Sequence, residues 1–148
     1  MSLPRPLVAS PEASSKPAIV PVEGEAETMS TNTVMLVDTD PDTLAARRRT
    51  FESAGFRVVA AYSGTAALGL ARETLPGFVI IDAALPDLDG MDFASILKND
   101  PATRDIHIIF VNQLDEASDR RRAELGCGHV PKALGDGPML TAVRDKLV

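Results

Sequence analysis

The sequence predicts one α/β domain in which helices cover both faces of a parallel β-sheet. From Thr33 onward, short apolar runs alternate with segments of helical periodicity, which is typical of such a sheet. The run Phe78–Ile81 is apolar throughout, as expected of a central strand that is buried on both faces. Five strand–helix units fit between Thr33 and Val148, a length that suits one domain better than two.

The first strand–helix unit is marked by an apolar run followed by a helix start. Val34–Val37 is expected to be a short buried strand. Asp40 is the expected N-cap, and Pro41 takes the first helical position, where its missing N–H costs nothing. The helix should end at Gly55 and carry Leu44, Arg48 and Phe51.

The four later units repeat this pattern. The remaining strands are expected at Phe56–Ala60, Phe78–Ile81, Ile106–Val111 and, very short, Val130–Pro131. The remaining helices, the first of them capped by Ser63, are expected at Ser63–Leu75, Met91–Asn99, Asp115–Leu125 and Met139–Leu147. Because crossovers between parallel strands are right-handed, few strand orders remain, and we expect the order 2-1-3-4-5 of a doubly wound, flavodoxin-like (βα)5 domain.

Composition and charge exclude several classes of protein. The chain has 148 residues and a formal charge of −6, which argues against a non-specific nucleic-acid coat, because that function needs a basic face. The single cysteine, Cys127, excludes an internal disulfide and a cysteine-built metal site, and it fits a reducing, cytoplasmic environment. No apolar run approaches the roughly 20 residues that a membrane helix needs.

The first 32 residues differ in composition from the rest of the chain. Between Pro4 and Asn32, prolines are mixed with Ser, Glu and Ala without periodicity, and no continuous apolar core marks a signal peptide. Such a segment buries too little apolar surface to offset the loss of chain entropy. We therefore expect residues 1–32 to be a disordered, proline-rich linker or tail and residues 33–148 to be the folded domain.

Polar side chains gather where the predicted strands end. In doubly wound sheets, the working site lies beyond the carboxyl ends of the strands. A carboxylate that directly follows a buried strand carries a high desolvation cost unless it is paired or bound to a metal, so Asp38 and Asp82 are the leading candidates. Taken singly, Asp40 is explained by helix capping and Lys132 by solvation, and only the joint pattern indicates a site. The residues expected at this edge are Asp38, Thr39, Asp40, Asp82, Asn112, Gln113 and Lys132.

Three motifs resemble the receiver domain of two-component response regulators. The stretch FVIIDAALPDLDGMDF resembles the family's phosphoacceptor strand and loop, LVDTDPD its acidic first loop, and HVPK its last strand and lysine. The resemblance implies that Asp82 takes a phosphoryl group from a histidine kinase or a histidine phosphotransfer protein, and that the domain signals rather than acting as an enzyme. It also implies that Asp38, Asp82 and the backbone carbonyl of Ala84 hold Mg²⁺, and that Lys132 contacts the phosphoryl group.

The sequence departs from the family pattern at several positions of this site. Thr39 stands where a second acid is usual, which should weaken Mg²⁺ binding, although Asp40 could reach the ion through a water. Asn112 replaces the switch hydroxyl and would contact the phosphoryl group through its amide, and His129 replaces the switch aromatic residue. The phosphorylation residues therefore follow the family pattern more closely than the switch residues do.

Two other functions stay open from the sequence. A degenerate receiver would serve as a docking surface whether or not it is phosphorylated. Alternatively, DTDPDT resembles the nucleophile motif of haloacid-dehalogenase-type phosphatases, with Asp38 as the nucleophile and Asp40 as the acid. Pro41 and Asp42 do not fit that motif, and a phosphatase would leave LPDLDG unexplained.

Two runs of arginine fall on predicted helices. Arg47–Arg49 lies on the first helix and Arg120–Arg122 on the fourth, and each is expected to be a solvated face. Alternatively, Arg47–Arg49 helps to dock an acidic kinase or phosphotransfer helix bundle, because receivers of this kind meet partners through the first helix. The signal would leave by protein–protein contact or through covalently linked domains of a longer protein, with no direct nucleic-acid or membrane partner.

Overall fold

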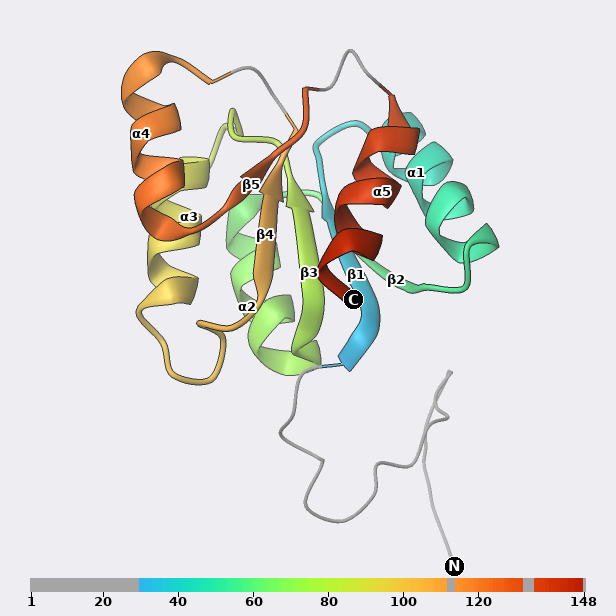
Figure 1. Ribbon diagram of the computed structural model, residues 1–148. Helices are drawn as coiled ribbons and strands as arrows, with labels where there is room; N and C mark the ends of the chain where they lie inside the picture. Colours follow the sequence, from blue (N-terminus) through green and yellow to red (C-terminus); the bar gives the residue numbers. More distant parts are fainter. Residues whose placement is uncertain (1–29, 112–113, 132–134, 148) are drawn as a thin grey trace, which may run out of the picture.

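In the computed structural model, which describes residues 30–111, 114–131 and 135–147, five parallel strands form one sheet in the order β2-β1-β3-β4-β5 (Figure 1). The strands are β1 (Ser30–Val37), β2 (Arg57–Ala61), β3 (Pro76–Ile81), β4 (His107–Phe110) and β5 (Gly128–His129). The helices are α1 (Pro41–Ser53), α2 (Gly64–Thr74), α3 (Gly90–Lys98), α4 (Glu116–Leu125) and α5 (Asp136–Leu147). The doubly wound, flavodoxin-like arrangement and its strand order are confirmed.

Each face of the sheet has its own apolar core. Helices α1 and α5 cover one face, where Phe51 of α1 packs with Leu36 of β1 (Figure 1). Helices α2 and α3 cover the other face, where Phe93 of α3 packs with Met35 and Ile81. Successive strand residues point to opposite faces, and Val34–Val37 of β1 and Phe78–Ile81 of β3 are buried on both sides, which explains why these two runs are apolar throughout. Among the described helices, none is long and apolar enough to cross a membrane.

The first strand is longer than predicted. β1 begins at Ser30 rather than Val34, because the chain pairs with Pro76 of β3 at Ser30 before the regular ladder starts at Val34 and Phe78. Residues 30–32, which were expected to belong to the tail, therefore lie in the sheet. The rest of that predicted tail, residues 1–29, lies outside the described residues.

The last strand and the last helix both begin earlier than predicted. β5 is Gly128–His129 instead of Val130–Pro131. The N–H of Val130 still donates to the carbonyl of Phe110 (2.8 Å), but Pro131 has no N–H with which to continue the ladder. Helix α5 begins at Asp136. Pro138 is compatible with this start, because it lies in the first turn, where no intrahelical N–H bond is needed.

Side-chain caps determine where the helices start. Asp40 caps α1 and Ser63 caps α2, as predicted, and Asp115 caps α4. The carboxylate of Asp89 caps α3 by accepting from the N–H of Met91 (2.7 Å). Each cap satisfies an N–H that has no partner within its own helix.

A second cap of α2 comes from the distant β3–α3 loop. The carboxylate of Asp87 accepts hydrogen bonds from the hydroxyl of Thr65 (2.7 Å), the N–H of Thr65 (2.9 Å) and the N–H of Gly64 (3.0 Å). These bonds, led by that of the Thr65 hydroxyl, favour the charged form and lower the pKa of Asp87 to about 2. The loop LPDLDG is thereby tied to the start of α2.

Asp87→Asn should lower the melting temperature at about pH 5 and above, because an amide oxygen is a weaker acceptor than a carboxylate. The pKa of Asp87 in the folded protein lies below the ordinary value of 3.8, so the contribution to stability is fully present above that pH and is lost as the pH falls through about 2. The difference in melting temperature between the wild type and the variant should therefore shrink as the pH falls below 3.8. A difference that stays constant in circular dichroism melts would contradict this role.

Candidate functional site

The two leading aspartates follow neighbouring strands and lie at the carboxyl edge of the sheet. Asp38 follows β1 and Asp82 follows β3, and these strands are paired so that Val37 lies opposite Ile81. The N–H of Asp82 donates to the carbonyl of Val37 (3.3 Å), which holds the two strand ends at the same level. The structure therefore brings together two acids that lie 44 positions apart in the sequence.

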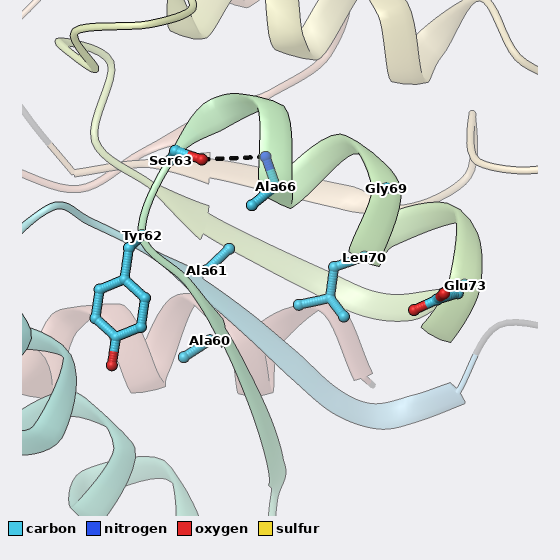
Figure 2. A pocket seen from close by; sticks show the side chains of 8 residues that line it. All are labelled: Ala60, Ala61, Tyr62, Ser63, Ala66, Gly69, Leu70 and Glu73. Atoms are coloured by element: carbon cyan, nitrogen blue, oxygen red, sulfur yellow. Dashed lines mark hydrogen bonds between the residues drawn. The ribbon is translucent and has the colours of Figure 1, made fainter.

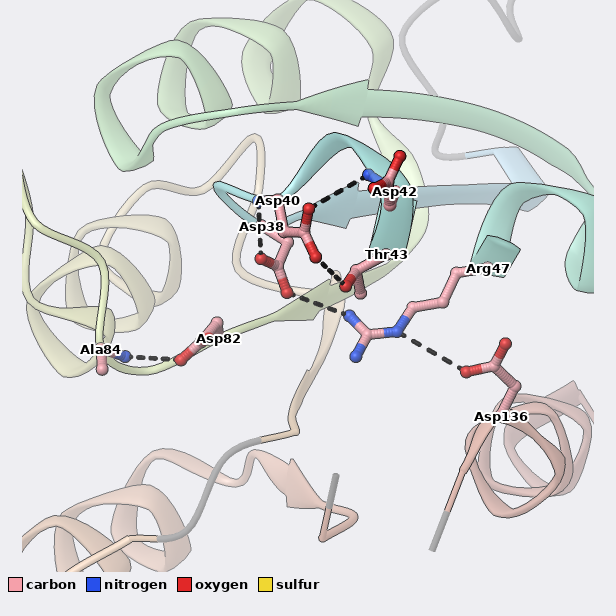
Figure 3. A network of polar contacts seen from close by, with 8 residues as sticks. All are labelled: Asp38, Asp40, Asp42, Thr43, Arg47, Asp82, Ala84 and Asp136. Carbon is pink, nitrogen blue, oxygen red and sulfur yellow. Dashed lines mark hydrogen bonds and ion pairs between the residues drawn. The ribbon is translucent and has the colours of Figure 1, made fainter. Parts of the chain in front are cut away.

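Asp38 is buried and its carboxylate is engaged on both oxygens. The residue is about 2% exposed. Its Oδ1 accepts from the N–H of Asp40 (3.0 Å), and its Oδ2 lies 3.5 Å from Nη1 of Arg47 (Figure 3). A cation and a backbone donor therefore hold the carboxylate of Asp38 in place.

Arg47 is buried, so the prediction that Arg47–Arg49 forms a solvated face is wrong at this position. Its side chain is about 3% exposed, because helical spacing places it on the same inner face of α1 as Leu44 and Phe51. Its guanidinium extends from α1 to Asp38, and its Nε lies 3.7 Å from Oδ1 of Asp136 in α5 (Figure 3). The spacing of three and four residues to Leu44 and Phe51 was the signal that could have identified it.

Asp82 is half-buried, and the backbone of its own loop orients its side chain. Oδ1 accepts from the N–H of Ala84 (2.9 Å), and Figure 3 shows this carboxylate directed toward Ala84. The next turn is held by the N–H of Gly90, which donates to the carbonyl of Ala83 (3.1 Å). The start of α3 therefore supports the loop that follows Asp82.

The side chain of Asp40 faces α1. Its Oδ1 accepts from the N–H of Asp42 (3.2 Å) and its Oδ2 from the hydroxyl of Thr43 (2.7 Å). Thr39, the neutral residue at the usual position of an acid, is exposed. The water-mediated role of Asp40 at a metal stays a prediction, and it would have to coexist with the capping bonds.

The oxygen donors at this edge suit a hard divalent cation. Asp38, Asp82 and the carbonyl of Ala84 supply two carboxylates and one backbone oxygen, and Mg²⁺ is commonly held by one or two carboxylates together with water and phosphate oxygens. Within residues 30–111, 114–131 and 135–147, no group of three or more His, Cys, Asp or Glu side chains could hold a metal ion. The donor set thus fits Mg²⁺ in kind, with fewer acids than a three-carboxylate site, and the Mg²⁺ site stays a prediction.

Several predicted site residues are not placed by the structure. Asn112, Gln113 and Lys132 lie outside the described residues, so their phosphate-contacting and switch roles stay predictions. His129 is on β5 and is half-buried. Its role as a switch residue also stays a prediction.

A pocket of about 500 Å³ lies away from this edge, between the end of β2 and α2 (Figure 2). Figure 2 shows the Ser63 cap at one end, where its hydroxyl accepts from the N–H of Ala66 (3.1 Å). Neither Asp38 nor Asp82 lines this pocket. The candidate site is therefore the carboxyl edge of the sheet at Asp38 and Asp82, which we call the acidic edge. The pocket is separate from it.

Comparison with known proteins identifies the family of this domain. Residues 34–143 match the family described as "Response regulator receiver domain". The polar-differentiation response regulator DivK of Brucella ovis is 31% identical over 96 residues, which cover 65% of this chain and 78% of that protein. The response regulator PleD of Caulobacter vibrioides is 35% identical over 65 residues, which cover 44% of this chain and 14% of that protein.

Solved structures show the same fold. The chemotaxis protein CheY4 of Vibrio cholerae superposes with a TM-score of 0.70 at 19% identity, covering 80% of this chain and 98% of that chain. A CheY-like receiver domain protein of Methanospirillum hungatei superposes with a TM-score of 0.74 at 18% identity, covering 80% of this chain and 94% of that chain. At such identities the likeness concerns the fold alone.

Proposed function

The chain belongs to the response regulator receiver domains of two-component systems, and from that premise we propose that it accepts a phosphoryl group on Asp82. The donor is a histidine kinase or a histidine phosphotransfer protein, and the phosphorylated domain signals by protein–protein contact. The observation that carries the proposal is the pair of aspartates at the carboxyl edge of the sheet. The half-buried Asp82 is oriented there by the N–H of Ala84 (2.9 Å). We further propose a cytoplasmic location, where such donors and a free Cys127 are both expected.

The proposed reaction is a transfer between two anionic groups. A carboxylate oxygen of Asp82 attacks phosphorus, the P–N bond of the phosphohistidine breaks, and the electron pair returns to the imidazole. An acyl phosphate forms on Asp82 without net oxidation or reduction. When bound by Asp38, Asp82 and the Ala84 carbonyl, Mg²⁺ would offset the repulsion between these anions. By the family resemblance, we propose that Lys132 and Asn112 contact the phosphoryl oxygens.

The proposal is tested by treating the purified chain with acetyl phosphate and Mg²⁺ and measuring its intact mass. We expect a mass increase of one phosphoryl group in the wild type and none in Asp82→Asn. The matched control is Asp92→Asn, which removes an exposed carboxylate on α3 and should keep the adduct. A wild type that stays unmodified at saturating donor and Mg²⁺ would overturn the proposal.

One observation favours a second function, phosphorylation-independent docking. Arg47 already neutralises Asp38, and Thr39 supplies no charge, so the acidic edge has less affinity for a cation than a three-acid site would have. If the domain works in this way, the wild type and the Asp82→Asn variant should bind the partner with equal affinity. The mass measurement described above separates the two functions.

Docking of the phosphodonor should depend on the exposed part of the α1 arginine run. Arg48 and Arg49 are exposed, and Arg48 makes a surface ion pair with Glu52 at 3.9 Å. We expect the double variant Arg48→Glu/Arg49→Glu to slow phosphotransfer from a protein donor by roughly tenfold, because complementary charge accelerates encounter. The rate with acetyl phosphate should not change. If both rates fell together, the docking role would be wrong.

A further inference from the structure

We propose that Arg47 is a built-in cation of the acidic edge, and that a divalent metal ion must displace its guanidinium to bind Asp38. The inference rests on the proposed function only in treating this edge as the acidic pocket of a receiver. It makes Arg47 a determinant of metal affinity, a role distinct from the docking role suggested by the sequence.

The burial of Arg47 is the first step of the argument. An arginine side chain that is only about 3% exposed has lost most of its hydration, so its charge requires negative partners. The structure supplies two of them from opposite sides, Asp38 at 3.5 Å and Asp136 at 3.7 Å. The cation is therefore built into the fold between the acidic edge and the start of α5 (Figure 3).

The looseness of these contacts is the second step. Well-formed hydrogen bonds between charged groups are about 2.7–2.9 Å long, whereas both contacts of Arg47 are longer. The Nε of Arg47 is buried without a hydrogen-bond partner among the described residues. The guanidinium is thus held mainly by charge, and it can shift without breaking a tight bidentate pair.

The geometry of Asp38 is the third step. Its Oδ1 accepts from the N–H of Asp40, and the guanidinium of Arg47 lies beside its Oδ2. A metal ion that binds Oδ2 would meet a positive charge at short range in a poorly hydrated place, where repulsion is strong. Metal binding therefore requires the guanidinium to move toward Asp136, which also accepts from the hydroxyl of Thr50 (3.2 Å).

The test is a calorimetric titration of the protein with Mg²⁺, without any phosphodonor. We expect Arg47→Gln to bind Mg²⁺ about tenfold or more tightly than the wild type, because the competing charge is gone. The matched control is Arg48→Gln, which makes the same change in net charge one residue away on an exposed side chain. It should change the affinity by less than about twofold. Unchanged or weaker binding in Arg47→Gln, or an equal gain in both variants, would overturn the proposal.

A second measurement uses the wild type and so does not depend on a variant that folds. The Nε–Hε resonance of Arg47 is followed by ¹⁵N NMR during the Mg²⁺ titration. We expect it to shift in a saturable way, with the same midpoint as the calorimetric binding curve. A resonance that stays in place while Mg²⁺ binds would overturn the proposal. Since neither measurement involves phosphorylation, a failure of Asp82 to form an adduct would leave this inference standing.

Discussion

Replacing Asp38 with alanine should lower the free energy of unfolding by about 3 kcal/mol. Asp38 is the nearer of the two carboxylates beside Arg47, and both members of the pair are almost fully buried. The variant leaves a buried guanidinium with Asp136, at 3.7 Å, as its remaining acidic partner among the described residues. Urea unfolding followed by far-ultraviolet circular dichroism measures the change.

Two further variants show whether the loss comes from an uncompensated charge. Arg48→Ala removes an exposed charge from the same helix and should change stability by less than about 0.5 kcal/mol. The double variant Asp38→Leu/Arg47→Met removes both buried charges and should regain most of the loss, because Asp136, the remaining partner of Arg47, is partly exposed and still accepts from Thr50. If Asp38→Ala were as mild as Arg48→Ala, the buried pair would not support the fold.

Gly90→Ala is expected to destabilise the fold by about 1–3 kcal/mol through overpacking. A Cβ at this position would lie 2.7 Å from Cα of Ala83 and 3.0 Å from the ring of Phe110. The first of these neighbours is backbone, which cannot rotate away as a side chain can. The turn after Asp82 would therefore have to shift, and the free energy of unfolding measured in urea should fall.

Gly69→Ala is the matched control for this substitution. Gly69 is exposed within α2, and nothing lies within 4 Å of the Cβ that alanine would add. Because alanine has the higher helix propensity, the variant should gain about 0.5–1 kcal/mol. Gly90→Ala should also reduce the adduct on Asp82, since it disturbs the loop that orients this carboxylate. Changes of the same sign and size in both variants would contradict the role assigned to close packing at Gly90.

The parts of the fold that the sequence predicts well are those with local signals. Asp40 and Ser63 sit at helix starts as expected, because a cap acts on N–H groups two or three residues away. The apolar run Phe78–Ile81 identifies a central strand, because burial on both faces leaves no place for polar residues. The fifth strand was misplaced, since a ladder of two residues has too little pattern to separate Gly128–His129 from Val130–Pro131.

The candidate site could be predicted only in part. The positions of Asp38 and Asp82 follow from their strands, because parallel strands end at one edge. The pairing of Asp38 with Arg47 did not follow, because three successive arginines resemble an exposed charged run. The spacing to Leu44 and Phe51 places Arg47 on the inner face of α1, but the carboxylates that it meets there depend on how α1 and α5 pack on the sheet.

By itself, the sequence determined the alternation of strands and helices, the strand order that this alternation permits and the family of the domain. These properties depend on residues close together in the chain or on motifs of a few residues. The tertiary structure alone decided that Arg47 is buried between Asp38 and Asp136, and that Asp87 caps the distant helix α2. Such contacts depend on how whole helices and strands pack against one another. The energies of hydrogen bonds and ion pairs change steeply with distance, and a local sequence pattern does not specify the distance between residues that are far apart in the chain.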